Sequence, residues 1–278
     1  MRGVILAGGL GTRMGIVSKA VNKHCNLVYH KPMILYPLAT LRDMGIDEIL
    51  VVTSEGSAGQ LINLLGDGSD YGVSMSYVFQ KSPAGIADAL SGAEDFSRGE
   101  PIAVILGDNF FNPTPNILEG WEGGARILLT PTTSPQDFGV VKLDEPYKSY
   151  HAQGGSFIYS YGEDGVPTWT TGSSDSYQSV EGMLLEYPIV GIVEKPQEYI
   201  GNLMVTGIYM YDTQVWDIIR GLRPSSRGEY EITDVNREYL RRDELGCSVY
   251  TGMWLDCGSP DLLLDASNYA REHRLVVL

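Results

Sequence analysis

Acidic residues are absent from the start of the chain, since no Asp or Glu occurs before Asp43. This absence is unusual because the 278 residues carry 35 acidic and 20 basic side chains, a formal charge of −15. The same stretch holds only cations as charged residues, namely Arg2, Arg13, Lys19, Lys23, Lys31 and Arg42. A segment kept free of carboxylates in an acidic protein indicates an anion-binding site.

Cysteine and long apolar runs are also scarce. Cys25, Cys247 and Cys257 are too scattered for a disulfide framework, and no CxxC pair indicates structural zinc. No apolar run is long enough to span a membrane, and the N-terminus does not resemble a signal peptide, so the cytoplasm is the expected location. The acidic balance argues against nucleic acid as a partner.

Short apolar runs alternate with amphipathic stretches in the first part of the chain. Strands are predicted at residues 3–7, 48–53, 74–79 and 101–106, and helices at 32–41, 57–65 and 86–96. This order predicts an α/β fold with a mostly parallel central sheet, which binds ligands beyond the carboxyl ends of its strands. Later strands are expected at 125–130, 138–143, 189–196 and 203–211, and helices at 230–242 and 259–272.

Residues 145–188 break this order and are rich in Tyr, Ser and Gly. A segment of that length is uncommon as plain coil inside a domain, so a β-rich insertion is predicted there. With no clear linker elsewhere, we expect residues 1–278 to form a single domain that carries the insertion.

A glycine-rich loop follows the first predicted strand, in Gly8-Gly9-Leu10-Gly11-Thr12-Arg13. Glycines let backbone N–H groups turn toward an anion, and Arg13 adds a planar fork that suits phosphate oxygens. A P-loop is excluded because no Lys follows Gly11, and a dinucleotide fingerprint lacks its third glycine at Met14. A loop that wraps a nucleoside triphosphate remains, beside the plainer alternative of a glycine turn with scattered surface cations.

Further blocks extend this pattern along the chain. They are Lys23, Lys31-Pro32-Met33, Leu64-Leu65-Gly66-Asp67-Gly68-Ser69, Gln80-x-Ser82-Pro83-x-Gly85, Leu106-Gly107-Asp108-Asn109, Phe138-Gly139-Val140-Val141, Glu194-Lys195-Pro196, Val205-Thr206-Gly207-Ile208-Tyr209, Arg227-Gly228-Glu229-x-Glu231-Ile232-Thr233-Asp234 and Trp254-Leu255-Asp256-x-Gly258. With the glycine loop, they resemble the sugar-phosphate nucleotidyltransferases, in the order found in glucose-1-phosphate thymidylyltransferases. The resemblance covers nearly the whole chain except residues 145–188.

The resemblance implies a Rossmann-like three-layer sandwich, the nucleotide-diphospho-sugar transferase fold. It implies that glucose 1-phosphate attacks the α-phosphorus of dTTP, that Mg²⁺ is the cofactor, and that the chain forms a homo-oligomer, a tetramer or a dimer. A phosphate monoester is mostly dianionic at pH 7, so such a reaction needs charge neutralisation and alignment rather than a general base.

The resemblance also implies a set of site residues. Expected at the nucleotide are Leu6, Gly8, Gly9, Gly11, Thr12, Arg13, Gln80, Gly85 and Asp108, and at the sugar phosphate Gly139, Glu194, Lys195, Thr206, Tyr209 and Arg227. Asp108 and Asp256 are the expected Mg²⁺ ligands, because hard carboxylate oxygens suit that ion. Catalysis is expected to depend on Arg13, Lys23, Asp108, Lys195 and Asp256.

The sequence departs from the family around Lys23. Ile16 stands where relatives usually have proline, and His24-Cys25-Asn26-Leu27 replaces a common Gln-Leu-Leu-Pro. The chain also ends soon after the helix that begins near Asp261, which puts feedback control through further C-terminal helices in doubt. Two alternatives therefore stay open: a uridylyl- or cytidylyltransferase acting on a related sugar 1-phosphate, and an inactive sugar-nucleotide-binding regulator.

Overall fold

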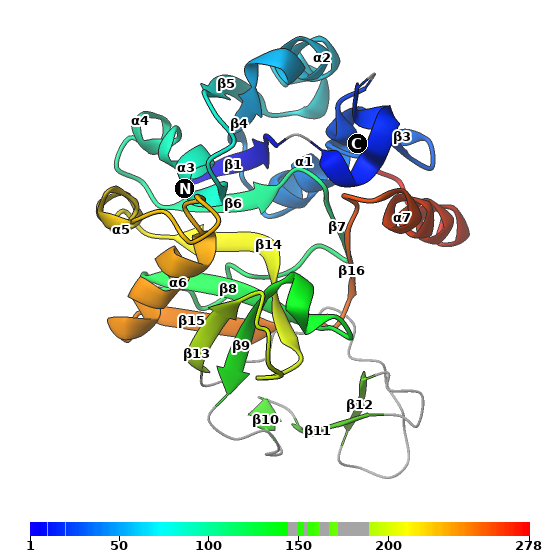
Figure 1. The fold of residues 1–278 in the computed structure, drawn as a ribbon. Coiled ribbons are helices and arrows are strands. Elements are labelled where there is room, and N and C mark those ends of the chain that lie inside the picture. Colours follow the sequence, from blue (N-terminus) through cyan, green and yellow to red (C-terminus); the bar gives the residue numbers. More distant parts are fainter. Residues whose placement is uncertain (10, 20, 144–149, 153–154, 162–166, 172–188) are drawn as a thin grey trace.

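A nine-stranded mixed sheet is the centre of the computed structural model, which describes residues 1–9, 11–19, 21–143, 150–152, 155–161, 167–171 and 189–278 (Figure 1). Its parallel half contains, in order, β6 (Ile102–Leu106), β1 (Arg2–Ala7), β4 (Glu48–Ser54) and β5 (Ser74–Gln80). The antiparallel β14 (Leu203–Tyr211) joins β6 to β8 (Ala125–Pro131) and β9 (Gly139–Leu143). β13 (Ile189–Glu194) lies beside β9, and β15 (Leu245–Val249) lies parallel to β8. The expected α/β class is confirmed.

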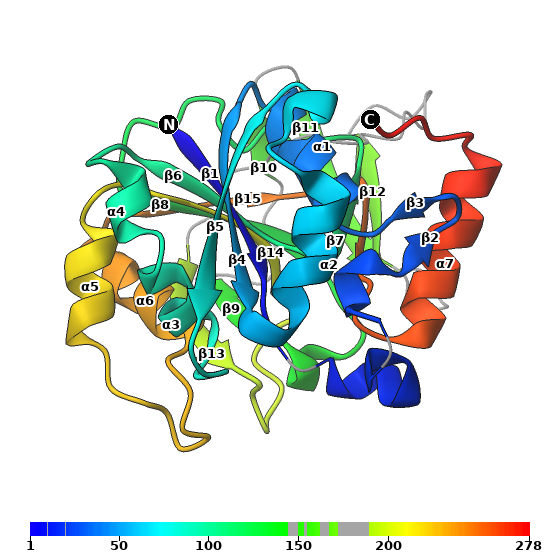
Figure 2. The same ribbon diagram turned by 90° about the horizontal axis from the view of Figure 1, so that it is seen from above.

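Helices cover both faces of this sheet (Figure 2). On one side are α1 (Leu35–Asp43) and α2 (Glu55–Leu65), with α7 (Pro260–Glu272) further out; on the other are α3 (Ile86–Ser91), α5 (Val215–Gly221) and α6 (Ile232–Arg241). β1 is apolar on both faces and therefore needs cover on both. Val4 and Leu6 belong to the hydrophobic core on one side of the sheet, and Ile5 and Ala7 belong to the core on the other side. A strand buried on both faces needs the continuous apolar run seen in the sequence.

The predicted helix over residues 86–96 is wrong in its extent. α3 ends at Ser91, and a short second helix, α4 (Glu94–Ser97), follows it. Gly92 lies between the two, and glycine weakens a helix interior. By contrast, the predicted start of the last helix is confirmed, since the Ser259 side chain accepts a hydrogen bond from the Leu262 backbone N–H at 3.4 Å.

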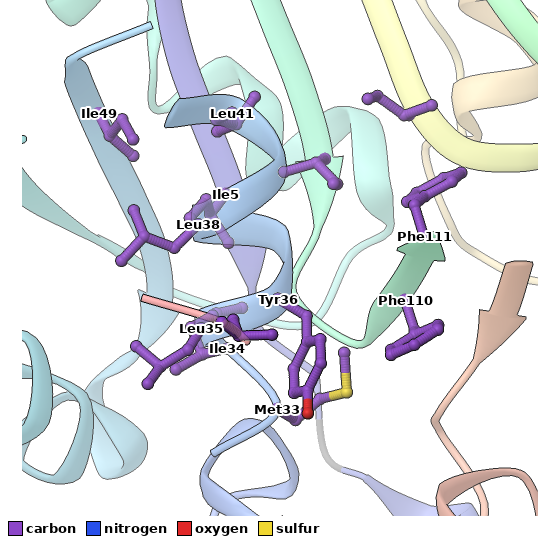
Figure 3. Close-up of a cluster of buried hydrophobic side chains, with 14 of the residues drawn as sticks. Ile5, Met33, Ile34, Leu35, Tyr36, Leu38, Leu41, Ile49, Phe110 and Phe111 are labelled. Atoms are coloured by element: carbon purple, nitrogen blue, oxygen red, sulfur yellow. The ribbon is translucent and has the colours of Figure 1, made fainter. Parts of the chain in front are cut away.

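The core between α1 and the sheet holds β1 in place (Figure 3). Ile5, Leu38, Leu41 and Ile49 are fully buried there. Each such side chain contributes roughly 1.5–3 kcal/mol when it leaves water. This packing fixes the direction of β1, so the glycine loop after Ala7 leaves the sheet at its carboxyl edge.

Two short strand pairs were not predicted from the sequence. β7 (Asn109–Asn112) pairs antiparallel with β16 (Met253–Asp256), and β2 (Leu27–Val28) pairs with β3 (Lys31–Pro32). In the first pair, Asp256 lies opposite Asn109. That register brings a carboxylate from the end of the chain beside the carboxyl end of β6, and so completes one edge of the site.

The predicted insertion at 145–188 lies largely outside the described residues. Within it, β10 (Tyr150–Ala152), β11 (Gly155–Tyr161) and β12 (Pro167–Thr171) form an antiparallel sheet, which agrees with its expected β-rich character. The chain leaves at the end of β9 and returns at the start of β13, where Leu143 pairs with Ile189. Among the described residues, no helix has the length and apolar character needed to cross a membrane.

Candidate active site

The glycine loop leaves β1 with backbone angles that suit glycine. Gly9 and Gly11 have φ values of 91° and 61°, in the region that side chains rarely adopt. A Cβ at Gly8 would lie 2.8 Å from Gln80 Oε1, and one at Gly11 would lie 3.3 Å from the Ser18 side chain. The loop therefore passes close to neighbouring groups. Its last residues, Thr12 and Arg13, begin η1 (Thr12–Lys19), a 3₁₀ segment that is kinked at Gly15.

Two ion pairs join this first segment to distant carboxylates. Lys23, in η2 (Lys23–Cys25), pairs with Asp108, which follows β6. Arg13 Nη2 lies 2.9 Å and 3.3 Å from the two carboxylate oxygens of Asp256, at the end of β16. The Cys257 backbone N–H donates to the Asp108 carbonyl at 2.8 Å, which holds the two acidic positions side by side. Two cations and two carboxylates thus meet at the carboxyl edge of the sheet.

The pKa values of the two carboxylates are shifted in opposite directions. Burial by itself raises the pKa of Asp108, but Lys23, with smaller effects of His24 and Arg13, lowers that pKa to about 2. Burial and the charge on Asp108 raise the pKa of Asp256, against the opposing effect of Arg13. Two largely buried carboxylates close enough for one to raise the pKa of the other favour a site that accepts positive charge.

Asn109 connects these elements from inside the fold. Its Oδ1 accepts hydrogen bonds from the Trp254 indole N–H at 2.7 Å and from the Gly207 backbone N–H at 3.0 Å. With Oδ1 occupied in this way, the amide nitrogen faces Asp108 Oδ1 at 3.4 Å. Asn109 is 1% exposed. One buried amide therefore sets the spacing between β7, β14 and β16 beneath the paired carboxylates.

His24 belongs to the segment in which the sequence departs from the family, and it is buried beside Lys23. Its Nδ1 lies 2.8 Å from Asn22 Oδ1, and its ring packs against Gly107. Among the described residues, Nε2 has no hydrogen-bond partner. Burial, and then the charge on Lys23, lower the pKa of His24 to about 3, so the ring is neutral in the folded protein.

Acid should destabilise the protein through His24. The unfolded chain takes up this proton below about pH 6.5, and the folded chain only near pH 3, so stability is lost as the pH falls through that window. Between about pH 7.5 and about pH 5 this loss should be about 2 kcal/mol. Urea unfolding at both pH values should show it as the difference between wild type and His24→Gln. His30→Gln, at an exposed position, is the control; an identical pH dependence in all three proteins would contradict the assignment.

Among the residues predicted to bind the sugar phosphate, Glu194 is held at the end of β13. The Thr233 hydroxyl donates to Glu194 Oε2 at 2.6 Å, and Glu194 lies opposite Gly139 of β9. A Cβ at Gly139 would lie 3.0 Å from Thr233 Oγ1 and 3.2 Å from Glu194 Oε2. Glycine at this position therefore leaves room for the glutamate.

The two predicted sugar-side cations differ in their surroundings. Arg227 Nη2 lies 2.9 Å from both carboxylate oxygens of Glu231, and further from Glu194 and Glu229 at 3.4 Å and 3.5 Å. Lys195 follows β13, and its backbone N–H donates to Phe138 at 2.9 Å. Its ammonium group makes no ion pair within the described part of the chain. Of these two cations, Lys195 is therefore the one that has no carboxylate partner among the described residues.

A cavity of about 600 Å³ brings the predicted residues together. Its lining includes Leu6, Gly8, Gly9, Thr12, Arg13, Lys23, Gln80, Gly85, Asp108, Gly139, Glu194, Lys195, Thr206, Tyr209, Arg227 and Asp256. Of the expected residues only Gly11 is not among them. Thr206 and Tyr209 are almost fully buried in the wall of the cavity, and the Thr206 hydroxyl donates to the Leu128 carbonyl at 2.9 Å. Burial also raises the pKa of Tyr209.

Several lining residues had no role in the sequence interpretation. They are Asn109, Asp137, Phe138, Glu229, Glu231, Thr233 and Trp254. Most of them stand beside assigned residues in the recognised blocks, so adjacency could have drawn attention to them. Asp137 stands just before such a block and carried no signal of its own.

The fold, the glycine loop and the paired carboxylates are those of one protein family. The family model described as nucleotidyl transferase matches residues 2–154 and 180–273. The chain belongs to this family, and the expected enzyme class, a nucleotidyltransferase, is confirmed.

Similar proteins show which members of this family the chain resembles. The chain is 37% identical to a glucose-1-phosphate thymidylyltransferase of Mycolicibacterium smegmatis, over 98% of this chain and 82% of that protein. It is 34% identical to the protein of the same name from Neisseria meningitidis, over 98% and 83%. A crystal structure assigned as a glucose-1-phosphate thymidylyltransferase from Bacillus anthracis superposes with a TM-score of 0.79 at 34% identity, over 98% and 96% of the two chains. A UDP-glucose pyrophosphorylase at 21% identity shares the fold, with a TM-score of 0.74.

Proposed function

We propose that this chain transfers a thymidylyl group from dTTP to glucose 1-phosphate, with release of pyrophosphate. The observation that carries the proposal is the meeting of Arg13 and Lys23 with Asp108 and Asp256 at the edge of the glycine loop. Full-length similarity to proteins named for this reaction supports the choice of substrates.

The residues of the site suit the charge problem of this reaction. The sugar phosphate is already a dianion, so it needs no base, and it must approach a second polyanion. Arg13, Lys23 and the N–H groups of the glycine loop would hold the triphosphate, while Lys195, with no carboxylate partner in the described part of the chain, would neutralise the sugar phosphate. Fixing both in line removes most of the entropic barrier. Glu194, oriented by Thr233, would accept hydrogen bonds from sugar hydroxyls.

The donor set fits Mg²⁺ as the cofactor. Asp108 and Asp256 offer hard carboxylate oxygens, and among the described residues no cluster of three potential ligands forms a complete shell. Mg²⁺ commonly takes one or two carboxylates and completes its shell with substrate phosphates and water. When bound, it would shield the phosphate charges from one another. Asp108 and Asp256 would hold it.

Binding of substrate would exchange partners at the ion pairs. Arg13 and Lys23 neutralise the two carboxylates in the structure, and phosphate oxygens would compete for the same cations. Arg13 and Lys23 form favourable charge-assisted pairs either with the carboxylates or with phosphate oxygens. The carboxylates that the nucleotide frees can then hold the metal ion, so metal ion and nucleotide are expected to bind together. This exchange explains how two acidic groups can lie in a phosphate site.

A substrate panel tests the proposal. Pyrophosphate release should be measured with Mg²⁺, glucose 1-phosphate and each of dTTP, UTP and CTP, and dTTP should give the highest kcat/KM. A higher value with UTP or CTP would assign the chain as the corresponding uridylyl- or cytidylyltransferase. Release with none of them, while nucleotide still binds in calorimetry, would instead identify an inactive sugar-nucleotide-binding regulator.

A further inference from the structure

Gln80 lies at the carboxyl end of β5, and its amide has a fixed orientation. Its Nε2 donates to Asp88 Oδ2 at 2.9 Å and to the Gly85 carbonyl at 3.3 Å. Both partners are acceptors, so this end of the amide must be the NH₂ group and not the oxygen. The carbonyl Oε1 therefore points the other way, toward Gly8.

The acceptor end of Gln80 faces the glycine loop. Oε1 lies 2.8 Å from the position that a Cβ at Gly8 would take, and both residues line the 600 Å³ cavity. Within the described part of the chain, Oε1 accepts no hydrogen bond. The cavity therefore presents a lone acceptor, already turned toward the loop that would carry the nucleotide.

The backbone beneath this amide is rigid. Gly85 has φ 109°, and a Cβ there would lie 2.7 Å from the Tyr230 backbone nitrogen. Tyr230 donates to the Ala84 carbonyl at 2.7 Å and accepts from the Ala87 N–H at 3.1 Å. The Gly85 carbonyl cannot turn away, so the remaining variable in the orientation of Gln80 is the side chain of Asp88 in α3.

We propose that Asp88 is a positioning residue that locks the Gln80 amide, so that the site selects a pyrimidine with an N3–H donor and rejects cytosine. Thymine and uracil carry a hydrogen at N3, which Gln80 Oε1 would accept. Cytosine has a lone pair at N3, which would face Oε1 and leave both acceptors unpaired. Asp88 acts through Gln80 and does not touch the base. Its role rests on the proposed nucleotidyl transfer, because it is exerted in the same cavity.

The expected discrimination follows from the unpaired acceptors. Leaving a buried acceptor without a donor should weaken binding of the cytosine nucleotide by roughly ten- to a hundredfold. In Asp88→Asn, the new amide can offer Nδ2 or Oδ1, so it no longer dictates which end of Gln80 faces the base. The loss of a charge-assisted bond should lower the discrimination by about tenfold. Asp88→Ala removes the side-chain acceptor and should act in the same direction.

The test compares dissociation constants for dTTP, dUTP and dCTP, which share one sugar and differ only in the base. Calorimetry with Mg²⁺ on wild type, Asp88→Asn and Asp88→Ala gives the dCTP-to-dTTP ratio whether or not the protein turns over, and kcat/KM gives the kinetic ratio. Asp95→Asn, an exposed carboxylate on α4, is the matched control and should keep the wild-type ratio. dUTP should bind much as dTTP does in every protein.

The outcomes separate the two proposals. A dCTP-to-dTTP ratio that falls in both Asp88 variants, with an unchanged melting temperature and an unchanged ratio in Asp95→Asn, supports the positioning role of Asp88. A ratio unchanged in folded Asp88 variants, or a wild type that binds dCTP as well as dTTP, overturns it. Absence of pyrophosphate release from the wild type overturns the proposed function, while the binding ratio still decides the role of Asp88.

Discussion

Replacing Asp108 by asparagine should lower turnover by roughly 10²- to 10³-fold while the protein stays folded. A neutral amide of the same shape cannot hold a divalent cation as a carboxylate does, so phosphate charge would go unshielded. The change also leaves Lys23 charged and largely buried, since its side chain is 16% exposed. Breaking one side of a buried pair should reduce the free energy of unfolding by about 3–5 kcal/mol.

The same substitution should strengthen one interaction. Without its carboxylate partner, Lys23 is free for phosphate oxygens, so Asp108→Asn should bind dTTP in the absence of metal ions more tightly than wild type does. Pyrophosphate release, circular dichroism and calorimetry in chelator measure the three effects. Asp70→Asn, at an exposed position, is the control. Turnover within a few-fold of wild type would show that Asp108 has no part in the reaction.

Gly207→Ala should be among the most damaging single changes in the chain. Its Cβ would lie 2.6 Å from Asn109 Cγ, inside a buried contact that cannot open without moving the amide. Displacing Asn109 breaks its bonds to Trp254 and to the Gly207 backbone. Overpacking and lost buried hydrogen bonds together should reduce the free energy of unfolding by roughly 2–4 kcal/mol. Urea unfolding measures this loss, and activity should fall with it.

A second substitution identifies the cause. Asn109→Ala makes room for the new methyl group, so Gly207→Ala/Asn109→Ala should lose less stability than the sum of the two single variants. Gly246→Ala is the matched control, because the heavy atom nearest to a Cβ at this strand glycine, Arg126 Nε, would lie at 3.6 Å. Strictly additive losses would mean that the contact between residues 109 and 207 is not responsible.

The first half of the fold was open to prediction because its signals are local. Strands buried on both faces give continuous apolar runs, and β1, β4, β5 and β6 follow one another in the sequence with helices between them. The glycine loop is visible for the same reason, since its glycines adopt backbone angles that few other residues can. The family blocks contain most of the residues that line the cavity.

The rest of the site depends on pairing between distant segments. Nothing local in Met253–Asp256 says that it pairs with Asn109–Asn112, so the buried role of Asn109 could not be predicted. The ion pair between Arg227 and Glu194 and the bond from Gln80 to Asp88 are likewise side-chain contacts between elements. Such contacts follow from tertiary packing and leave no periodic trace in the sequence.

The carboxylate-free segment shows a limit of reasoning from charge alone. Arg13 and Lys23 reach the cavity, as that pattern suggested. Arg2 instead pairs with Glu48 and Glu100, and Lys31 donates to the Leu278 carbonyl at 2.8 Å. The absence of local acids did not leave these cations free, because the fold supplied acceptors from elsewhere.

Because β9 pairs with β13, the predicted sugar-phosphate side of the cavity can evolve separately from the predicted nucleotide side. Leu143 lies opposite Ile189, so the chain returns to the point from which it departs, and Gly139 stays opposite Glu194. Each doubling of the intervening segment adds only about 0.6 kcal/mol of closure entropy. The segment 144–188 can therefore be lengthened, trimmed or exchanged while Gly139 and Glu194 keep their positions opposite one another. The predicted nucleotide side, made of residues at or just after the ends of β1, β5 and β6 in the parallel half of the sheet, has no comparable freedom.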